Sequence, residues 1–177
     1  MIMTEQLVIT ALGEDRPGIV DELSNALTAH DLNIEDSRMS LLGGEFAILM
    51  LVSGSSNSIN TFMDETFTLE ASLRMKLLVK ATRKKAETQT LAPYAVEVVS
   101  MDHPGIVRDI ARFFSSRKIN IIDLDTSRYA AAHTGAPMFA LHMTVEIAAE
   151  QSIGKLREEF VNMCDQLNLD AKMTAKL

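Results

Sequence analysis

The sequence contains the stretch Asp15-Arg16-Pro17-Gly18-Ile19-Val20 and, further along, its near copy Asp102-His103-Pro104-Gly105-Ile106-Val107. In each half a short apolar run precedes the stretch, and the residues after it place apolar side chains at the spacing of one helix face. Proline suits the first position of a helix, and an aspartate ahead of it can cap the helix. The stretch therefore predicts a strand, a turn and a helix in each half, with Asp15 as a plausible cap and Pro17 as the first helical residue.

The similarity between the halves continues beyond this stretch. Asn33, Ile34 and Asp36 match Asn120, Ile121 and Asp123 at the same offset. After an insertion around residues 130–137, the run Phe46-Ala47-Ile48 matches Phe139-Ala140-Leu141. Surface hairpins accept such insertions at low cost. An internal repeat of this length predicts two copies of one domain.

Each half is predicted to fold in the order βαββαβ. In the first half we expect strands at residues 7–12, 33–42, 45–52 and 74–80, a helix from Pro17 to about His30, and a second helical face with the apolar residues Ile59, Phe62, Met63 and Phe67. Gly43-Gly44 suits a hairpin turn with positive φ. The second half repeats the pattern. The fold class is therefore α+β, with two ferredoxin-like domains in tandem, each an antiparallel sheet with helices on one face.

The boundaries of these domains follow from composition. We expect one domain at residues 1–81, a polar linker at 82–92 and the second domain at 93–177. The second strand of each domain is polar, which predicts a sheet edge. Open edges favour pairing, so we expect edge-to-edge association, either of the two domains or of two chains.

Composition and charge exclude several classes of protein. The chain has 177 residues, 47% of them hydrophobic, and a formal net charge of −7. A protein that grips nucleic acid directly needs a basic face, and the one basic run, at residues 80–85, is interpreted as part of the linker. No apolar run has the length of a membrane span, and residues 1–6 lack the pattern of a secretion signal. We therefore expect a cytoplasmic protein that binds neither DNA nor membrane.

No catalytic or metal-binding motif is present in the sequence. It lacks a phosphate-binding P-loop, a dinucleotide fingerprint, an HExxH helix and a serine elbow, and its four histidines lack the spacing of metal ligands. The single cysteine, Cys164, lies on an apolar helical face and is expected to be an inert core thiol. We predict a protein that is not an enzyme and holds no metal or cofactor.

The repeated turn has the chemistry of a small amino-acid site. A helix that begins there offers backbone N–H groups to a carboxylate, and a glycine lets the ligand approach closely. The asparagine at the start of the next strand carries donor and acceptor atoms, and its amide oxygen can accept from an ammonium group. The candidate ligand-binding residues are Asp15, Arg16, Pro17, Gly18, Ile19, Asn33, Asp102, His103, Pro104, Gly105, Ile106 and Asn120. The alternative is a purely conformational role for the glycines, a capping role for the aspartates and a backbone-pairing role for the asparagines.

The same residues resemble the ACT domain in both halves. Within that group, the stretches at residues 7–13, 33–38 and 50–55 resemble the glycine cleavage system transcriptional repressor family. The resemblance implies repression through contact with a DNA-bound activator of glycine cleavage genes, with glycine releasing the activator. The homo-oligomer that we expect rests on the open edge strands. His103 replaces the arginine at Arg16, so the second copy departs from the pattern.

Two other functions fit the same residues. The start Asp-Arg-Pro-Gly-Ile-Val also resembles the regulatory domain of formyltetrahydrofolate deformylase, which would make the protein a sensor that regulates a metabolic enzyme in trans. The other alternative is an assembly module that binds no ligand.

Overall fold

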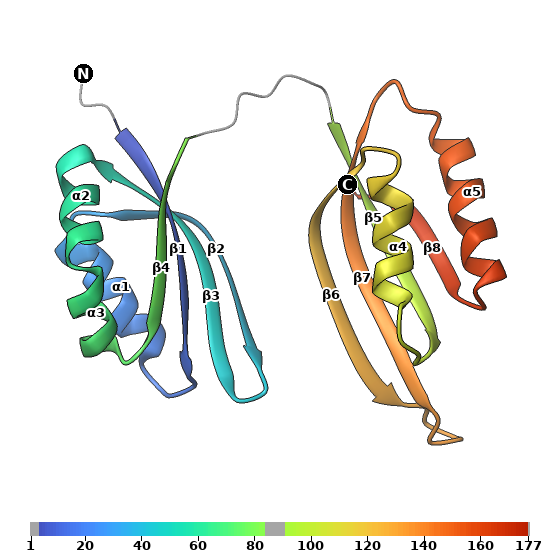
Figure 1. The fold of residues 1–177 in the computed structure, drawn as a ribbon, viewed down its shortest axis with the longest axis horizontal. Helices are drawn as coiled ribbons and strands as arrows, with labels where there is room; N and C mark the ends of the chain where they lie inside the picture. Colours follow the sequence, from blue (N-terminus) through green and yellow to red (C-terminus); the bar gives the residue numbers. More distant parts are fainter. Residues whose placement is uncertain (1–3, 84–90, 177) are drawn as a thin grey trace. The chain divides into compact units, whose positions relative to one another are not determined.

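The computed structural model describes residues 4–83 and 91–176, which form two compact units, Met1–Ala86 and Glu87–Leu177 (Figure 1). We predicted a linker at residues 82–92. In the structure both ends of this segment belong to strands, because one strand ends at Thr82 and the next begins at Leu91. Its remaining part, residues 84–90, lies outside the described residues.

The first unit is a four-stranded antiparallel sheet in the order β2-β3-β1-β4, with its helices on one face (Figure 1). Its elements are β1 (Thr4–Glu14), α1 (Ile19–Ala29), β2 (Asn33–Leu42), β3 (Glu45–Ser55), α2 (Ser56–Asp64), α3 (Thr66–Leu73) and β4 (Lys76–Thr82). The second predicted helix is divided at Glu65, where α2 ends and α3 begins. Phe67, expected on the buried helical face, is 82% exposed because it lies beyond this division.

The second unit repeats the arrangement with the strand order β6-β7-β5-β8. Its elements are β5 (Leu91–Met101), α4 (Ile106–Ser115), β6 (Asn120–Ala130), β7 (Pro137–Ala148), α5 (Ile153–Gln166) and β8 (Asp170–Ala175). The α+β prediction of two ferredoxin-like βαββαβ domains in tandem is therefore confirmed. The insertion inferred from the repeat falls in the loop between β6 and β7.

Each unit has its own hydrophobic core between its sheet and its helices. In the first core, Phe46 and Phe62 are almost fully buried, and in the second core Phe114 and Phe160 are fully buried. Cys164 belongs to the second core, and burial raises the pKa of its thiol to about 12. None of the described helices is long and apolar enough to cross a membrane.

The starts of the helices differ from the prediction. Helix α1 begins at Ile19, so Pro17 lies in the turn and is not the first helical residue. Gly18 occupies the capping position with a φ of 90°, and Asp15 does not cap the helix. The reason is that β1 extends to Glu14, and the Asp15 N–H donates a hydrogen bond to the carbonyl of Gly44. Asp15 is thereby held at the sheet, four residues before the first residue of the helix.

The predicted edge strands are confirmed. β2 and β6 each lie at the edge of a sheet, and every residue of β2 is exposed. The hairpin from β2 into β3 turns at Gly43 and Gly44, whose φ angles of 64° and 89° require glycine-like freedom.

Candidate functional site

The candidate site in the first unit is built around the turn from β1 into α1. The turn residues Asp15, Pro17 and Gly18 are exposed, and Ile19 is buried and anchors the helix in the core. Among the described residues no side chain caps α1, so the N–H groups of its first turn have no side-chain acceptor, and that of Ile19 donates to the carbonyl of Arg16 over 3.4 Å. A Cβ atom built on Gly18 would meet only the Glu22 carboxylate, at 3.9 Å. The turn is therefore open to a small anion.

Arg16 has a structural role at this turn. Its guanidinium donates two hydrogen bonds to the carboxylate of Glu22 and a third, of 3.2 Å, to the carbonyl of Leu73. The bidentate hydrogen bond from Arg16 holds the pKa of Glu22 below its usual value. Arg16 thus joins the start of α1 to the end of α3. We predicted Arg16 as a ligand contact, and the structure shows its donors occupied by Glu22 and Leu73.

The equivalent turn of the second unit is closed by different ion pairs. The carboxylate of Asp102 lies 2.7 Å from the guanidinium of Arg128. His103 is exposed, and its Nδ1 donates to the carbonyl of Pro104 over 3.2 Å. Asp109, the counterpart of Glu22, accepts hydrogen bonds from Arg108, which hold its pKa low. Among the residues the structure describes, no comparable ion pair engages the Asp15 carboxylate.

The helix of the second unit also begins after a glycine with positive φ. Gly105 has a φ of 102° and precedes Ile106, the first residue of α4, without a side-chain cap. A Cβ on Gly105 would lie 3.2 Å from the guanidinium of Arg108. The two turns therefore have the same backbone conformation before the helix and differ in the side chains that surround it.

The predicted asparagines do not lie beside the turns of their own units. Asn33 is opposite Ser53, which is opposite Gln6 at the start of β1, whereas the turn follows Glu14 at the other end of β1. Gln6 and Glu14 are eight residues apart in this register, which corresponds to about 27 Å along a strand. In the second unit, Asn120 is separated from its turn in the same way, because β6 runs parallel to β5.

Sequence reasoning missed the carboxylate that accompanies Asn33. The Asn33 amide donates a hydrogen bond of 3.2 Å to Glu35, which also accepts one from the hydroxyl of Ser53. These two hydrogen bonds, that from Ser53 first, hold the pKa of Glu35 below its usual value. Glu35 sits at a register shift between Ile34 and Asp36. A bulge in an edge strand leaves little trace in the sequence, so only the three-dimensional structure reveals this acidic group.

The two larger hollows, one in each unit, do not contain the predicted residues. A hollow of about 550 Å³ in the first unit is lined by Leu12, Gly13, Glu45, Phe67, Glu70, Ala71, Arg74, Met75 and Lys76. It lies on the β4 side of the sheet. Its acidic residue Glu70 accepts a hydrogen bond of 2.8 Å from the N–H of Leu77.

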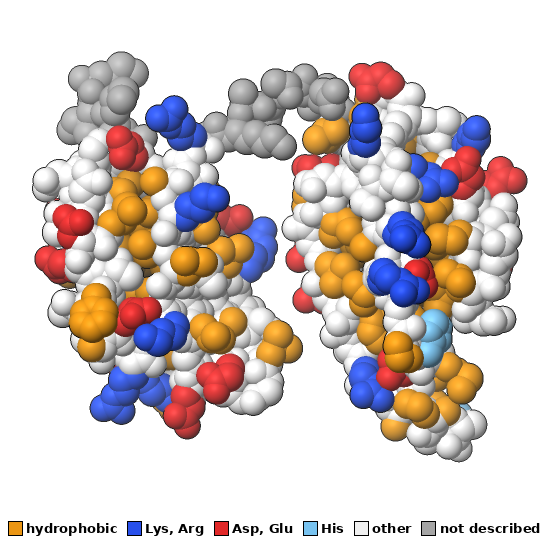
Figure 2. All heavy atoms as spheres, viewed as in Figure 1, with side chains coloured by type: hydrophobic (Ala, Val, Ile, Leu, Met, Phe, Trp, Pro, Cys, Tyr) orange, Lys and Arg blue, Asp and Glu red, His pale blue; other side chains and the backbone are white. Residues whose placement is uncertain are grey.

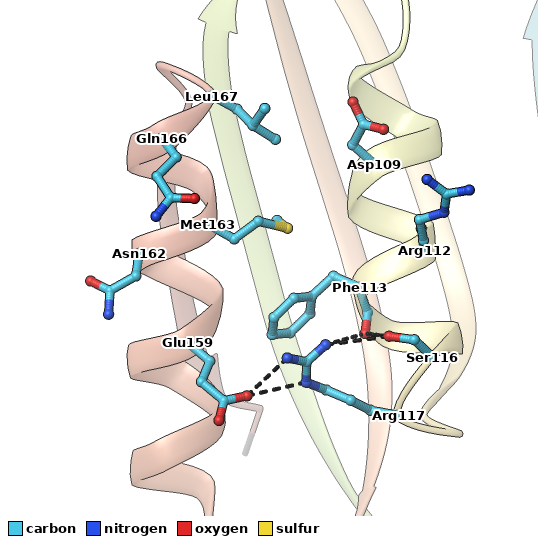
Figure 3. Close-up of a pocket in the computed structure, with 10 residues that line it drawn as sticks. All are labelled: Asp109, Arg112, Phe113, Ser116, Arg117, Glu159, Asn162, Met163, Gln166 and Leu167. Carbon is cyan, nitrogen blue, oxygen red and sulfur yellow. Dashed lines mark hydrogen bonds and ion pairs between the residues drawn. The ribbon is translucent and has the colours of Figure 1, made fainter.

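A groove of about 660 Å³ separates α4 from α5 in the second unit (Figure 3). Phe113, Met163 and Leu167 contribute apolar side chains to it, and polar side chains surround them. The guanidinium of Arg117 lies 3.8 Å from the centre of the Phe113 ring and is hydrogen-bonded to Glu159. Arg117 also donates to a backbone carbonyl, so its guanidinium already has hydrogen-bond partners and a counter-charge within the groove.

Among residues 4–83 and 91–176, no cluster of histidine, cysteine or carboxylate side chains could hold a metal ion.

The comparisons with known proteins agree with a regulatory role. The ACT domain profile matches residues 5–89. The chain is 33% identical over 163 residues to the glycine cleavage system transcriptional repressor of Escherichia coli, covering 92% of this chain and 85% of that protein. The chain belongs to the glycine cleavage system transcriptional repressor family.

Two solved structures extend the family likeness to the fold of the whole chain. The crystal structure of a candidate glycine cleavage system transcriptional repressor matches with a TM-score of 0.72 and 30% identity, covering 98% of both chains. A protein of unknown function from Galdieria sulphuraria matches with a TM-score of 0.80 and 25% identity, covering 99% of this chain and all of that one. Both likenesses extend over nearly the whole chain, so these two proteins share the fold of both units.

Proposed function

We propose that the protein is a transcriptional regulator that responds to a small amino acid, with glycine as the first candidate. It acts by contact with a DNA-bound activator of glycine cleavage genes, and glycine releases that activator. The family likeness covers nearly the whole chain, and the named relative is a repressor of this system. The net charge of −7 supports an indirect mode, because direct DNA binding requires a basic face.

The observation that carries the proposal is the open turn at Gly18. Its N–H groups and the positive end of the α1 dipole suit the carboxylate of an amino acid. Asp15 adds an exposed carboxylate at the same end of the sheet, and a carboxylate is a suitable acceptor for an ammonium group. The Arg16–Glu22 pair fixes the backbone on which the N–H groups sit.

Asn33 and Glu35 supply the second half of the site when two copies associate through their β2 edges. In an antiparallel β2–β2 pair, the start of one strand lies beside the end of the other. The Asn33–Glu35 cluster of one copy then lies at the end of the joined sheet that carries the Gly18 turn of the second copy. The carboxylate of Glu35 is suited to the ligand's ammonium group, since it is ionised and hydrogen-bonded.

Calorimetric titration of the intact protein with glycine, serine and the other standard amino acids tests ligand binding. Saturable binding that is strongest for glycine is expected, and binding to no amino acid would contradict the sensor role. Glu35→Gln removes the ammonium-binding charge and keeps the shape, so we expect affinity to fall by at least tenfold. Glu146→Gln is the matched control, because Glu146 is the acidic residue opposite Asn120 in the second unit. Unchanged affinity in Glu35→Gln would remove Glu35 from the site.

Partner contact requires a separate experiment. The purified protein is mixed with the activator bound to its DNA site, and complex formation is followed by native gel shift with and without glycine. We expect the protein to join the complex only through the activator and to leave it when glycine is added. Binding to bare DNA, or a complex that glycine does not affect, would contradict the proposed mechanism.

A further inference from the structure

The first sheet has an apolar outer face, meaning the face turned away from its helices. Side chains alternate across a strand, and the register places them in three rows from β2 through β3 and β1 to β4. These rows are Asp36, Leu51, Val8 and Lys80; Arg38, Leu49, Thr10 and Leu78; and Ser40, Ala47, Leu12 and Lys76. Apolar residues occupy the middle of each row except at Thr10, and charged residues occupy most of the ends.

The leucines of this face are open to solvent in the isolated unit. Leu12 and Leu49 are each 48% exposed, and Leu78 is 71% exposed. In the view of Figure 2, apolar side chains reach the surface of the first unit beside lysine and arginine side chains. A shallow hollow of about 210 Å³ next to Arg38 lies between Val8 and Leu49 on the same face. Contiguous exposed apolar surface of this kind is typical of a binding surface.

The second sheet is an internal control for this observation. At the positions of Arg38, Leu49, Thr10 and Leu78, the second unit has Asp125, His142, Glu97 and Lys172, again as one row across the sheet. His142 and Glu97 are exposed, and no leucine takes part in that row. The fold therefore tolerates a fully polar row at these positions. Folding of the domain alone does not explain the leucines of the first sheet.

We propose that the outer face of the first sheet packs against the same face of a second copy of this chain. The two-fold axis lies between the two sheets and runs parallel to their strands. Such an axis reverses the order of the strands, so that β2 of one copy lies over β4 of the other. Face-to-face packing of sheets with their strands roughly aligned is common in proteins.

Charge complementarity selects this occupant and this axis. With the axis parallel to the strands, the row that begins with Asp36 faces its own reversed copy, so Asp36 lies opposite Lys80 of the second copy and Val8 opposite Leu51. An axis perpendicular to the strands would instead place Lys80 over Lys76 of the second copy, which is repulsive. The face is thus complementary to itself in one orientation, as a two-fold interface requires.

This contact is separate from the β2 edge and does not rest on amino-acid binding. Its test is sedimentation equilibrium of the intact protein over a wide concentration range, without amino acids. The variant Leu49→His/Leu78→Lys gives the first sheet the residues that the second sheet has at these positions. We expect the dissociation constant to rise roughly a hundredfold or more, since four exposed leucines, two from each copy, leave the interface.

Phe67→Lys is the matched control, because Phe67 is an exposed apolar residue on the helical side of the same unit. Its association should equal that of the unchanged protein. Circular dichroism verifies that each variant folds. An unchanged protein that remains monomeric at all concentrations would overturn the proposal. The proposal would also be overturned if the double-leucine variant formed an assembly of the same mass as the unchanged protein. Another surface would then hold the copies together, or another part of the chain would cover this face.

Charge reversal tests the axis and does not depend on the leucine variant. Lys80→Glu and Asp36→Lys should each weaken association roughly threefold to tenfold, since each breaks two equivalent exposed ion pairs per dimer. Asp36→Lys also removes the ion pair between Asp36 and Arg38 within each chain, so Lys80→Glu is the cleaner of the two single changes. Combining both changes restores the opposite charges and should restore association. Failure of the combined variant to recover would exclude the parallel axis.

Discussion

Replacing Gly18 with alanine perturbs the turn through its backbone alone. The φ of 90° lies in the left-handed region, where an L residue costs about 1–2 kcal/mol. No clash adds to this, because the new Cβ would meet only the Glu22 carboxylate, at 3.9 Å. Alanine also restricts the unfolded chain, which returns about 0.4–1 kcal/mol to the folded state. The net loss in the free energy of unfolding is therefore about 1 kcal/mol.

Differential scanning calorimetry can resolve this loss. The two units have separate cores, so we expect two transitions, and Gly18→Ala should shift only that of the first unit. For a domain of this size, about 1 kcal/mol corresponds to a decrease in Tm of about 4–8 °C. Gly154→Ala is the matched control, because Gly154 lies in α5 with ordinary φ and nothing within 4 Å of the new Cβ. Alanine there should raise the Tm of the second unit. If Gly18→Ala left the first transition unchanged or raised it, the left-handed turn would be refuted.

Three further changes test other parts of the structure. Because the pKa of Glu22 is lowered in the folded protein, the Arg16–Glu22 pair stabilises the first unit at pH values above the usual glutamate pKa of 4.5. This stability is lost as the pH falls through the lower folded-state pKa. In thermal melts at acid pH, Glu22→Gln should therefore lose less stability than the unchanged protein. Cys164, with a pKa of about 12, should resist Ellman's reagent at pH 8 in the folded protein and react at once in denaturant. Phe160→Ala should destabilise the second unit by about 3–5 kcal/mol in calorimetry and leave the transition of the first unit in place.

The fold was predictable from the sequence because it depends on local and periodic signals. Three local signals each specify one element: the repeated turn, the spacing of apolar residues along α1 and α4, and the Gly43-Gly44 hairpin. Because the pattern occurs twice, the second half of the sequence tests the elements predicted for the first half. The errors lie at element ends. Asp15 and Pro17 have the residue types of a helix start, but the hydrogen bond from Asp15 to Gly44 comes from the β2–β3 hairpin, which is distant in the sequence.

The candidate site was less predictable because it depends on register. The sequence suggested that Asn33 and the Gly18 turn act together, but strand pairing places them at opposite ends of the sheet. Likewise, the position of Arg16 in the sequence is compatible with a ligand contact. Only the structure shows that its guanidinium donates its hydrogen bonds to Glu22. Periodicity assigns a side chain to a face of its own element. It does not specify which partners lie across that face.

The comparison of the two units separates what the fold requires from what is specific to one copy. Both units keep a glycine with positive φ before the helix, which the tight turn requires on steric grounds. Arg16 has become His103, and the row containing Leu49 has become a row of polar residues around His142, while the backbone is the same. The ACT fold itself therefore requires neither an arginine at this turn nor an apolar outer face, although the Arg16–Glu22 pair stabilises the first unit. Substitutions that exchange these residues between the units should alter binding and association, and leave each unit folded.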